Sequence, residues 1–170
     1  MTPTPSAPPK RGVRIAWPHI FFALIGLALS VYAIHARLQI EAGQATGCSI
    51  NDVISCDDVI GSKWGKFAGI SLGWYGVAFW IVVMLTGISG AGTSVRNAKL
   101  QALAVAAVGL VCSLGLAFIA EFVLRKICPI CSGTHLTALG NFIYATWAWF
   151  KRDVPAVEAR EPLVESNARG

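Results

Sequence analysis

The sequence predicts an all-α fold: an integral membrane bundle of four transmembrane helices with an extracytoplasmic cap loop. Of its 170 residues, 55% are hydrophobic and only 14% are charged, whereas soluble domains carry about 25% charged residues. The few charges also leave four long uncharged runs. Each run is long enough for the roughly 20 helical residues that cross a bilayer. Helices are the default there, because no backbone polar group can stay unpaired in lipid.

The expected elements follow those runs in order. We expect helices at about 15–37, 67–91, 100–122 and 128–150. The first run follows basic residues, as in a signal peptide, but it is long for one and no convincing small-residue cleavage site follows it. Residues 38–66 form the only sizeable connection and should fold as the cap loop. Residues 1–14, which are Pro-rich and basic, and residues 151–170, which hold few apolar residues, should be disordered cytoplasmic tails.

The distribution of lysine and arginine predicts the orientation. One side of the expected bundle carries Lys10, Arg11, Arg14, Arg96, Lys99, Lys151, Arg152, Arg160 and Arg169. The other side carries Arg37, Lys63, Lys66, Arg125 and Lys126. Because the richer side is normally cytoplasmic, both termini should lie inside, and the cap loop should face the periplasm of a bacterial inner membrane. No basic stripe interleaved with aromatic residues indicates nucleic-acid binding.

A C-x-x-C pair, Cys128 and Cys131, stands at the start of the last expected helix. A helix N-terminus lowers a thiol pKa through its partial positive charge, and Arg125 and Lys126 add positive potential. Pro129 suits the first helical position, where its missing N–H costs nothing. We therefore favour a redox-active dithiol over a structural disulfide or inert thiols.

A second pair, Cys48 and Cys56, lies in the expected cap loop. Alone, its spacing fits a static disulfide as well as a mobile shuttle. Beside a membrane C-x-x-C the shuttle is favoured, because a second dithiol needs somewhere to send or collect electrons. Binding of zinc by all four sulfurs is the remaining alternative, although only one short C-x-x-C is present, so we expect no metal. Cys112, in the middle of a run, should behave as a small hydrophobic residue.

His135 follows Cys131 by four residues, which places both on nearly the same helix face. It could donate a hydrogen bond to a quinone oxygen or tune the thiolate. An equally open alternative is a histidine whose polar atoms are satisfied inside the bundle.

Taken together, these motifs resemble the vitamin K epoxide reductase family. They are, in order, the loop cysteine, Ile54-Ser55-Cys56, Ser62-Lys-Trp-Gly65, and Phe122-Val123-Leu124 leading into Cys128-Pro-Ile-Cys131. The resemblance covers roughly residues 15–150. It implies a four-helix bundle around a quinone pocket, with Cys128 and Cys131 as the active-site pair and Cys48 and Cys56 as the shuttle pair.

The same resemblance implies residues that contact the quinone: Trp64 over its ring, and Phe67 and Phe79 in the pocket. The vertebrate enzyme binds the quinone oxygens through an Asn and a Tyr, and here those places hold Leu72 or Ser71, and His135. This departure favours reduction of a quinone (ubiquinone or menaquinone) over reduction of vitamin K epoxide. Many bacterial members carry a fused thioredoxin-like domain. This chain shows none, so a separate periplasmic thioredoxin-like (DsbA-like) partner is expected.

The sequence thus predicts a membrane thiol-disulfide oxidoreductase that passes electrons from that partner through the loop pair and the C-x-x-C to a quinone and supports disulfide formation. Three further hypotheses stay open: strict vitamin K epoxide reduction, a zinc-binding membrane protein, and a structural membrane subunit held by inert disulfides.

Overall fold

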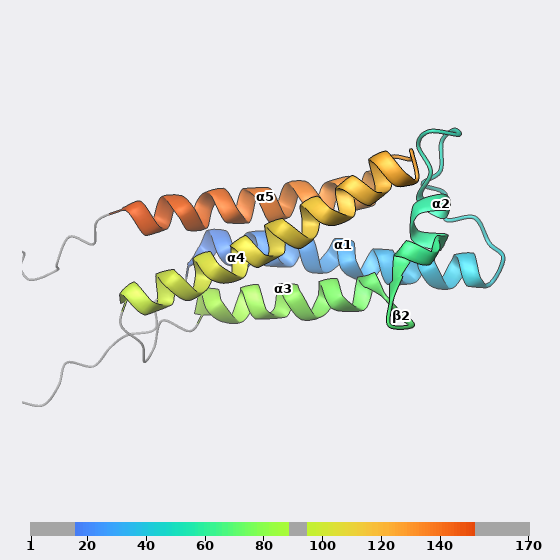
Figure 1. The fold of residues 1–170 in the computed structure, drawn as a ribbon. Coiled ribbons are helices and arrows are strands. Elements are labelled where there is room, and N and C mark those ends of the chain that lie inside the picture. Colours follow the sequence, from blue (N-terminus) through green and yellow to red (C-terminus); the bar gives the residue numbers. More distant parts are fainter. Residues whose placement is uncertain (1–15, 89–94, 152–170) are drawn as a thin grey trace, which may run out of the picture.

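A computed structural model describes residues 16–88 and 95–151. The tails expected at 1–14 and 151–170 lie outside these ranges, apart from Lys151. Within them, four long helices run side by side (Figure 1): α1 (Trp17–Glu41), α3 (Leu72–Ile88), α4 (Val95–Phe118) and α5 (Pro129–Phe150). The last turn of α4 continues as a π-helical segment, η2 (Ile119–Val123).

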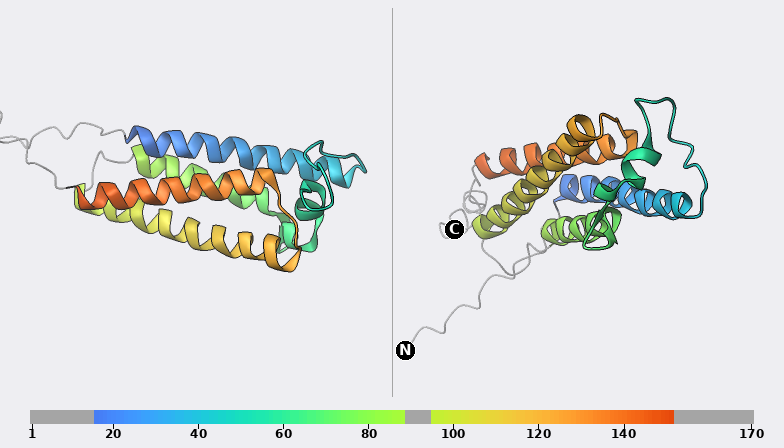
Figure 2. Two further views of the ribbon diagram at one scale, coloured as in Figure 1. Left: turned by 90° about the horizontal axis from the view of Figure 1, so that it is seen from above. Right: turned by 45° about the vertical axis from the view of Figure 1, so that its right-hand side comes forward.

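The short elements between α1 and α3 gather at one end of the bundle, as Figures 1 and 2 show. They are α2 (Cys56–Gly61), the 3-10 turn η1 (Lys63–Gly65) and two antiparallel strands, β1 (Lys66–Phe67) and β2 (Ile70–Ser71). The strands pair Lys66 with Ser71 and Phe67 with Ile70. This end also receives the C-terminus of α1 and the N-terminus of α5, so residues distant in sequence meet there.

The expected helix start at residue 67 is wrong, because α3 begins at Leu72. The hairpin turn holds Ala68 at φ 50° and Gly69 at φ 81°. Two consecutive left-handed residues cannot belong to a right-handed helix, and glycine tolerates that conformation without strain. The apolar run therefore contains a turn before its helix, which hydrophobicity alone does not mark.

Two other helix ends differ from the sequence prediction. Helix α1 runs to Glu41 instead of ending near residue 37, and the ion pair of Arg37 with Glu41 at 2.9 Å supports this last turn. Helix α4 begins at Val95, five residues before the expected start at 100. The expected helix 128–150 agrees with α5 to within one residue.

Small residues allow the helices to pack closely. A Cβ atom on Gly26 of α1 would overlap the ring of Trp80 of α3, which is 1% exposed. Likewise, Gly73 and Gly76 of α3 face Ser30 of α1. Close backbone approach through small residues is the usual way in which membrane helices associate. The packing of α1 against α3 therefore depends on the close fit of these small residues to their neighbours.

Among the described residues, two helical segments, Trp17–Glu41 and Arg96–Val123, are long and apolar enough to cross a membrane, and the described part of α3 is shorter. Helix α5 is 22 residues long and carries several polar side chains. Its polar side chains bond inside the bundle: the hydroxyls of Thr134, Thr137 and Thr146 donate to carbonyls four residues earlier. Nδ1 of His19 lies 2.7 Å from Oδ1 of Asn141, with both residues buried. Satisfied polar groups of this kind are tolerated in lipid.

The Gly26–Trp80 contact leads to a stability prediction. We expect Gly26→Ala to destabilise the fold by about 1–3 kcal/mol, because the indole must move in a filled core. Thermal unfolding in detergent measures this loss. The matched control is Gly115→Ala in α4, where nothing lies within 4 Å of the added carbon and stability should stay the same or rise slightly. Equal midpoints for the two variants would contradict the packing account.

Candidate active site

The sulfur atoms of Cys56 and Cys128 meet at the end of the bundle where α2, η1, β1 and β2 gather, which we call the capped end. Cys56 is the first residue of α2 and Cys128 immediately precedes α5. Their Sγ atoms lie 3.7 Å apart, and both residues are buried, at 0% and 2% exposure. Ala36 of α1 and Ile60 of α2 pack in the same cluster. A thiolate on either sulfur is therefore in contact with the other without access to bulk water.

Cys56 is also bonded to Cys48, which makes a continuous series of three sulfurs. The Cα atoms of this disulfide lie 5.7 Å apart, within the usual range for such bonds. Cys48 is half-buried, whereas Cys56 has no exposed surface. The disulfide is therefore asymmetric: Cys48 is its partly exposed residue, and Cys56 is the residue whose Sγ lies 3.7 Å from that of Cys128.

The local fold of the C-x-x-C favours a thiolate at Cys128. This residue is the N-cap of α5, and the backbone N–H of Cys131 donates to its Sγ at 3.3 Å. Pro129 occupies the first turn, as expected from its missing N–H. Free N–H groups at a helix start stabilise negative charge. Cys131 is half-buried within the helix, while Cys112 is exposed on α4 and takes no part in the site.

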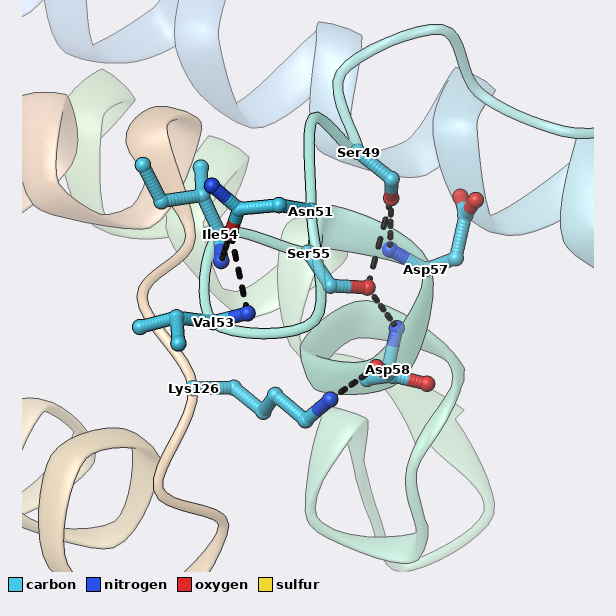
Figure 3. Close-up of polar contacts among 8 residues, drawn as sticks. All are labelled: Ser49, Asn51, Val53, Ile54, Ser55, Asp57, Asp58 and Lys126. Carbon is cyan, nitrogen blue, oxygen red and sulfur yellow. Dashed lines mark hydrogen bonds and ion pairs between the residues drawn. The ribbon is translucent and has the colours of Figure 1, made fainter.

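The loop that carries Cys48 and leads to Cys56 is joined to the segment before α5 by backbone hydrogen bonds. Ile127 donates its N–H to the carbonyl of Val53 at 2.8 Å, and Ser55 donates to the carbonyl of Ile127 at 3.0 Å. These bonds form an isolated parallel bridge between Ile54 and Ile127. An ion pair between Asp58 and Lys126 at 2.9 Å lies beside it (Figure 3).

Other polar contacts hold the loop in shape. The Ser55 hydroxyl caps α2 by accepting from the N–H of Asp58. The Thr46 hydroxyl donates to Asp57 at 2.6 Å and holds the pKa of that carboxyl below its usual value. The Lys126 ammonium does the same for the pKa of Asp58. From α1, the guanidinium of Arg37 donates to the carbonyls of Ile60 and Ser62, at the end of α2.

His135 is bound inside the bundle through one of its two ring nitrogens. Its Nδ1 lies 2.6 Å from the hydroxyl of Ser113 on α4. Fixing one nitrogen of a histidine sets the role of the other, so Nε2 is the atom left for another partner. His135 lies one turn beyond Cys131 on α5.

The aromatic residues expected around a quinone lie in two places. Trp64 and Phe67 belong to η1 and β1 at the capped end and are 42% and 66% exposed, and Ser71 ends the hairpin. The Phe67 ring packs edge-on against Tyr75. Phe79 instead lies midway along α3, against Gly109 of α4. It lines an apolar groove of about 410 Å³ between these helices.

Several residues of this site were not singled out from the sequence. Ser113 is 22 residues from His135 and no local pattern joins them. The pairing of Asp58 with Lys126 has only a weak signal in the sequence: acidic residues follow Cys56, and basic residues precede Cys128. Within residues 16–88 and 95–151, no three His, Cys, Asp or Glu side chains gather closely enough to hold a metal ion.

Apolar helices and apposed cysteine pairs place the chain among helical membrane oxidoreductases. A model of the vitamin K epoxide reductase family matches residues 17–146, and the chain belongs to that family. It is 32% identical over 133 residues to rat vitamin K epoxide reductase complex subunit 1, covering 69% of this chain and 80% of the relative. The mouse protein of the same name is 31% identical over 134 residues, with the same coverage. Membership supports a membrane redox enzyme that acts on a quinone or on vitamin K.

The sulfur contact predicts a specific crosslink. In Cys48→Ala/Cys131→Ala, mild oxidation should join Cys56 to Cys128 in nearly all molecules, because the two atoms need to move little from 3.7 Å to bonding distance. Peptide mass spectrometry after thiol blocking measures the product. The control adds Cys128→Ala, which leaves Cys56 with only Cys112, and should give no intramolecular bond. A crosslink to Cys112, or none at all, would contradict the geometry.

Proposed function

We propose that this chain is a quinone-dependent thiol-disulfide oxidoreductase that supports disulfide bond formation. Electrons pass from a thioredoxin-like partner through Cys48 and Cys56, then through Cys128 and Cys131, to ubiquinone or menaquinone. The observation that carries the proposal is the 3.7 Å contact of Cys128 with Cys56, which is itself bonded to Cys48. Thiol-disulfide exchange needs this kind of sulfur-to-sulfur access.

The helices support the membrane setting that we propose. All four long helices cross the bilayer, and the loop elements cap its periplasmic side. Helices α1 and α4 with η2 supply the most apolar spans, and α5 is accommodated because its polar groups bond within the bundle. Many large apolar side chains point outward along the helices, as lipid contact requires; they include Phe21, Leu24, Val108, Val111, Leu114 and Ile143. The excess of lysine and arginine on one side supports a cytoplasmic location of both termini.

Electrons enter at Cys48, because it is the accessible sulfur of the loop disulfide. A thiolate of the partner attacks Cys48, the Cys48–Cys56 bond breaks, and Cys56 leaves as a thiolate. The partner's second cysteine then attacks its own bridged sulfur and releases Cys48. The partner ends as a disulfide, and the loop pair has gained two electrons.

The second exchange takes place between the buried sulfurs. The Cys56 thiolate attacks Cys128 of an oxidised Cys128–Cys131 pair, and Cys131 leaves as a thiolate. Cys48 then attacks Cys56, which closes the loop disulfide again and releases Cys128. The N–H of Cys131, 3.3 Å from the Cys128 sulfur, stabilises the charge on this leaving group.

Oxidation of the Cys128/Cys131 dithiol to its disulfide supplies two electrons and two protons, which convert the quinone to quinol. Cys131 faces the quinone and Cys128 closes the disulfide. His135, one turn further into the bundle, directs Nε2 toward a quinone oxygen while Ser113 holds Nδ1. The groove lined by Phe79 offers apolar surface for the substrate, and Trp64, Phe67 and Ser71 contact it from the capped end.

The cysteine series tests the proposal. With a reduced thioredoxin-like partner and a soluble quinone, we expect Cys→Ala at positions 48, 56, 128 or 131 to abolish turnover, because each sulfur takes part in an exchange. Quinol formation measures turnover. Cys112→Ala, on the exposed side of α4, should retain near-normal activity. Full partner oxidation by Cys131→Ala would reject the relay, and stoichiometric zinc without quinone reduction would favour the metal-binding hypothesis.

The same assay, repeated with vitamin K epoxide, distinguishes the narrower hypothesis. The relatives are named for epoxide reductase activity, whereas His135 stands where the family resemblance implies a tyrosine. Quinone turnover without epoxide turnover is the expected result. Turnover of the epoxide at a similar rate would assign the strict activity instead.

The Ser113–His135 contact gives a prediction for quinone binding. His135→Leu should raise the KM for quinone, and Ser113→Ala should raise it about two- to tenfold, because a hydrogen bond that orients the ring contributes about 0.5–1.5 kcal/mol. Steady-state kinetics with varied quinone measures the effect. His35→Leu, which removes an exposed histidine of α1, is the control and should leave KM unchanged. Equal KM values in all variants would exclude His135 from the quinone site.

A further inference from the structure

We propose that the Asp58–Lys126 ion pair is a positioning contact for the exchange between Cys56 and Cys128, which rests on the relay proposed above. Asp58 lies two residues after Cys56 and Lys126 lies two residues before Cys128. Their charged groups are 2.9 Å apart. The ion pair therefore joins the same two segments as the sulfur contact.

The backbone bridge joins these segments on the other side of the sulfurs. Residues Val53 to Ser55 precede Cys56 and bond to Ile127. The ion pair follows Cys56 along α2 (Figure 3). The Cys56 sulfur is thus held at points before and after it, and α2 can neither slide along Ile127 nor pivot about it without breaking one contact. Loss of either contact would lower the effective concentration of one sulfur at the other.

The neighbouring carboxylate has a different task, which makes it a natural control. Asp57 accepts from the hydroxyl and the N–H of Thr46, inside the loop. Figure 3 shows its side chain directed away from Lys126. Both acids lie in the first turn of α2, so Asp→Asn at either position removes one negative charge from the same turn. Only Asp58 connects α2 to the segment before α5.

A pair of this kind should act on position more than on overall stability. The side chains of Lys126 and Asp58 are 27% and 54% exposed, and exposed ion pairs add little to the stability of a fold. The exchange between Cys56 and Cys128 is more sensitive to this pair than the stability of the fold is. A Cys56 that moves away from Cys128 can bond only to Cys48. The relevant quantity is therefore the partition of Cys56 between its two possible disulfide partners.

That partition can be measured without quinone, partner or added oxidant. In Cys131→Ala, the Cys128 thiolate attacks Cys56, the Cys48–Cys56 bond breaks, and Cys48 leaves as a thiolate; the reverse step restores the loop disulfide. One disulfide is present throughout. After acid quenching and thiol blocking, peptide mass spectrometry gives the ratio of the Cys56–Cys128 bond to the Cys48–Cys56 bond.

We expect Asp58→Asn to lower that ratio about two- to fivefold, the range that exposed ion pairs reach in double-mutant cycles, and Asp58→Lys to lower it further. Asp58→Lys combined with Lys126→Asp should recover most of the loss, because the attraction is restored with reversed sign. Asp57→Asn should not lower the ratio below that of the Cys131→Ala parent, because it weakens only contacts inside the loop that carries Cys48.

The outcomes separate this proposal from the relay. Unchanged ratios in the Asp58 variants, or a charge swap that recovers nothing, would overturn the positioning role while the relay stands. Equal loss in Asp57→Asn would assign the effect to loop charge and would also overturn it. If Cys131→Ala never forms the Cys56–Cys128 bond, the relay itself fails. Should Asp58→Lys fold poorly, Asp58→Asn and Lys126→Gln carry the same comparison.

Discussion

Two buried sulfur atoms from segments 72 residues apart lie within 3.7 Å of each other, and the capped end of the molecule depends on that contact. The short helix α2 brings Cys56, the N-terminus of α5 brings Cys128, and Ala36 of α1 fills the space beside both. Because chain entropy opposes such a long-range contact, it must be held by other interactions. The backbone bridge at Ile127 and the guanidinium of Arg37 on the α2 carbonyls supply them.

Burial gives the four cysteines different accessibility in spite of their identical chemistry. Cys48 is half-buried, Cys56 and Cys128 are enclosed, and Cys131 lies within the first turn of α5. In the proposed relay, a thiol partner from solution meets Cys48 first, and a quinone from the lipid meets Cys131. The enclosed pair between them is protected from both, so the proposed relay moves electrons through the exchanges in order. In that relay, burial determines the order of the exchanges, and reduction potentials determine the net direction of electron flow.

Hydrophobic runs and charge placement were sufficient to predict helices, but they could not locate the α3 start. The turn at Ala68 and Gly69 lies inside an uncharged stretch, and a pattern of apolar residues does not distinguish turn from helix there. The cysteine pairs were visible because their chemistry depends on residue type and spacing. Contacts such as that of Ser113 with His135 were not, since they arise only when α4 and α5 pack.

The polarity of α5 has a structural role that the apolar helices do not need. Asn141 bonds to His19 of α1, and His135 bonds to Ser113 of α4. These two positions are six residues apart and face different neighbours. Breaking either contact would leave a polar group unpaired in an apolar interior, at a cost of about 1–3 kcal/mol. Helix α5 is therefore fixed in its rotation about its own axis. Since Cys131 shares the face of His135, the same two hydrogen bonds decide which way the C-x-x-C is directed.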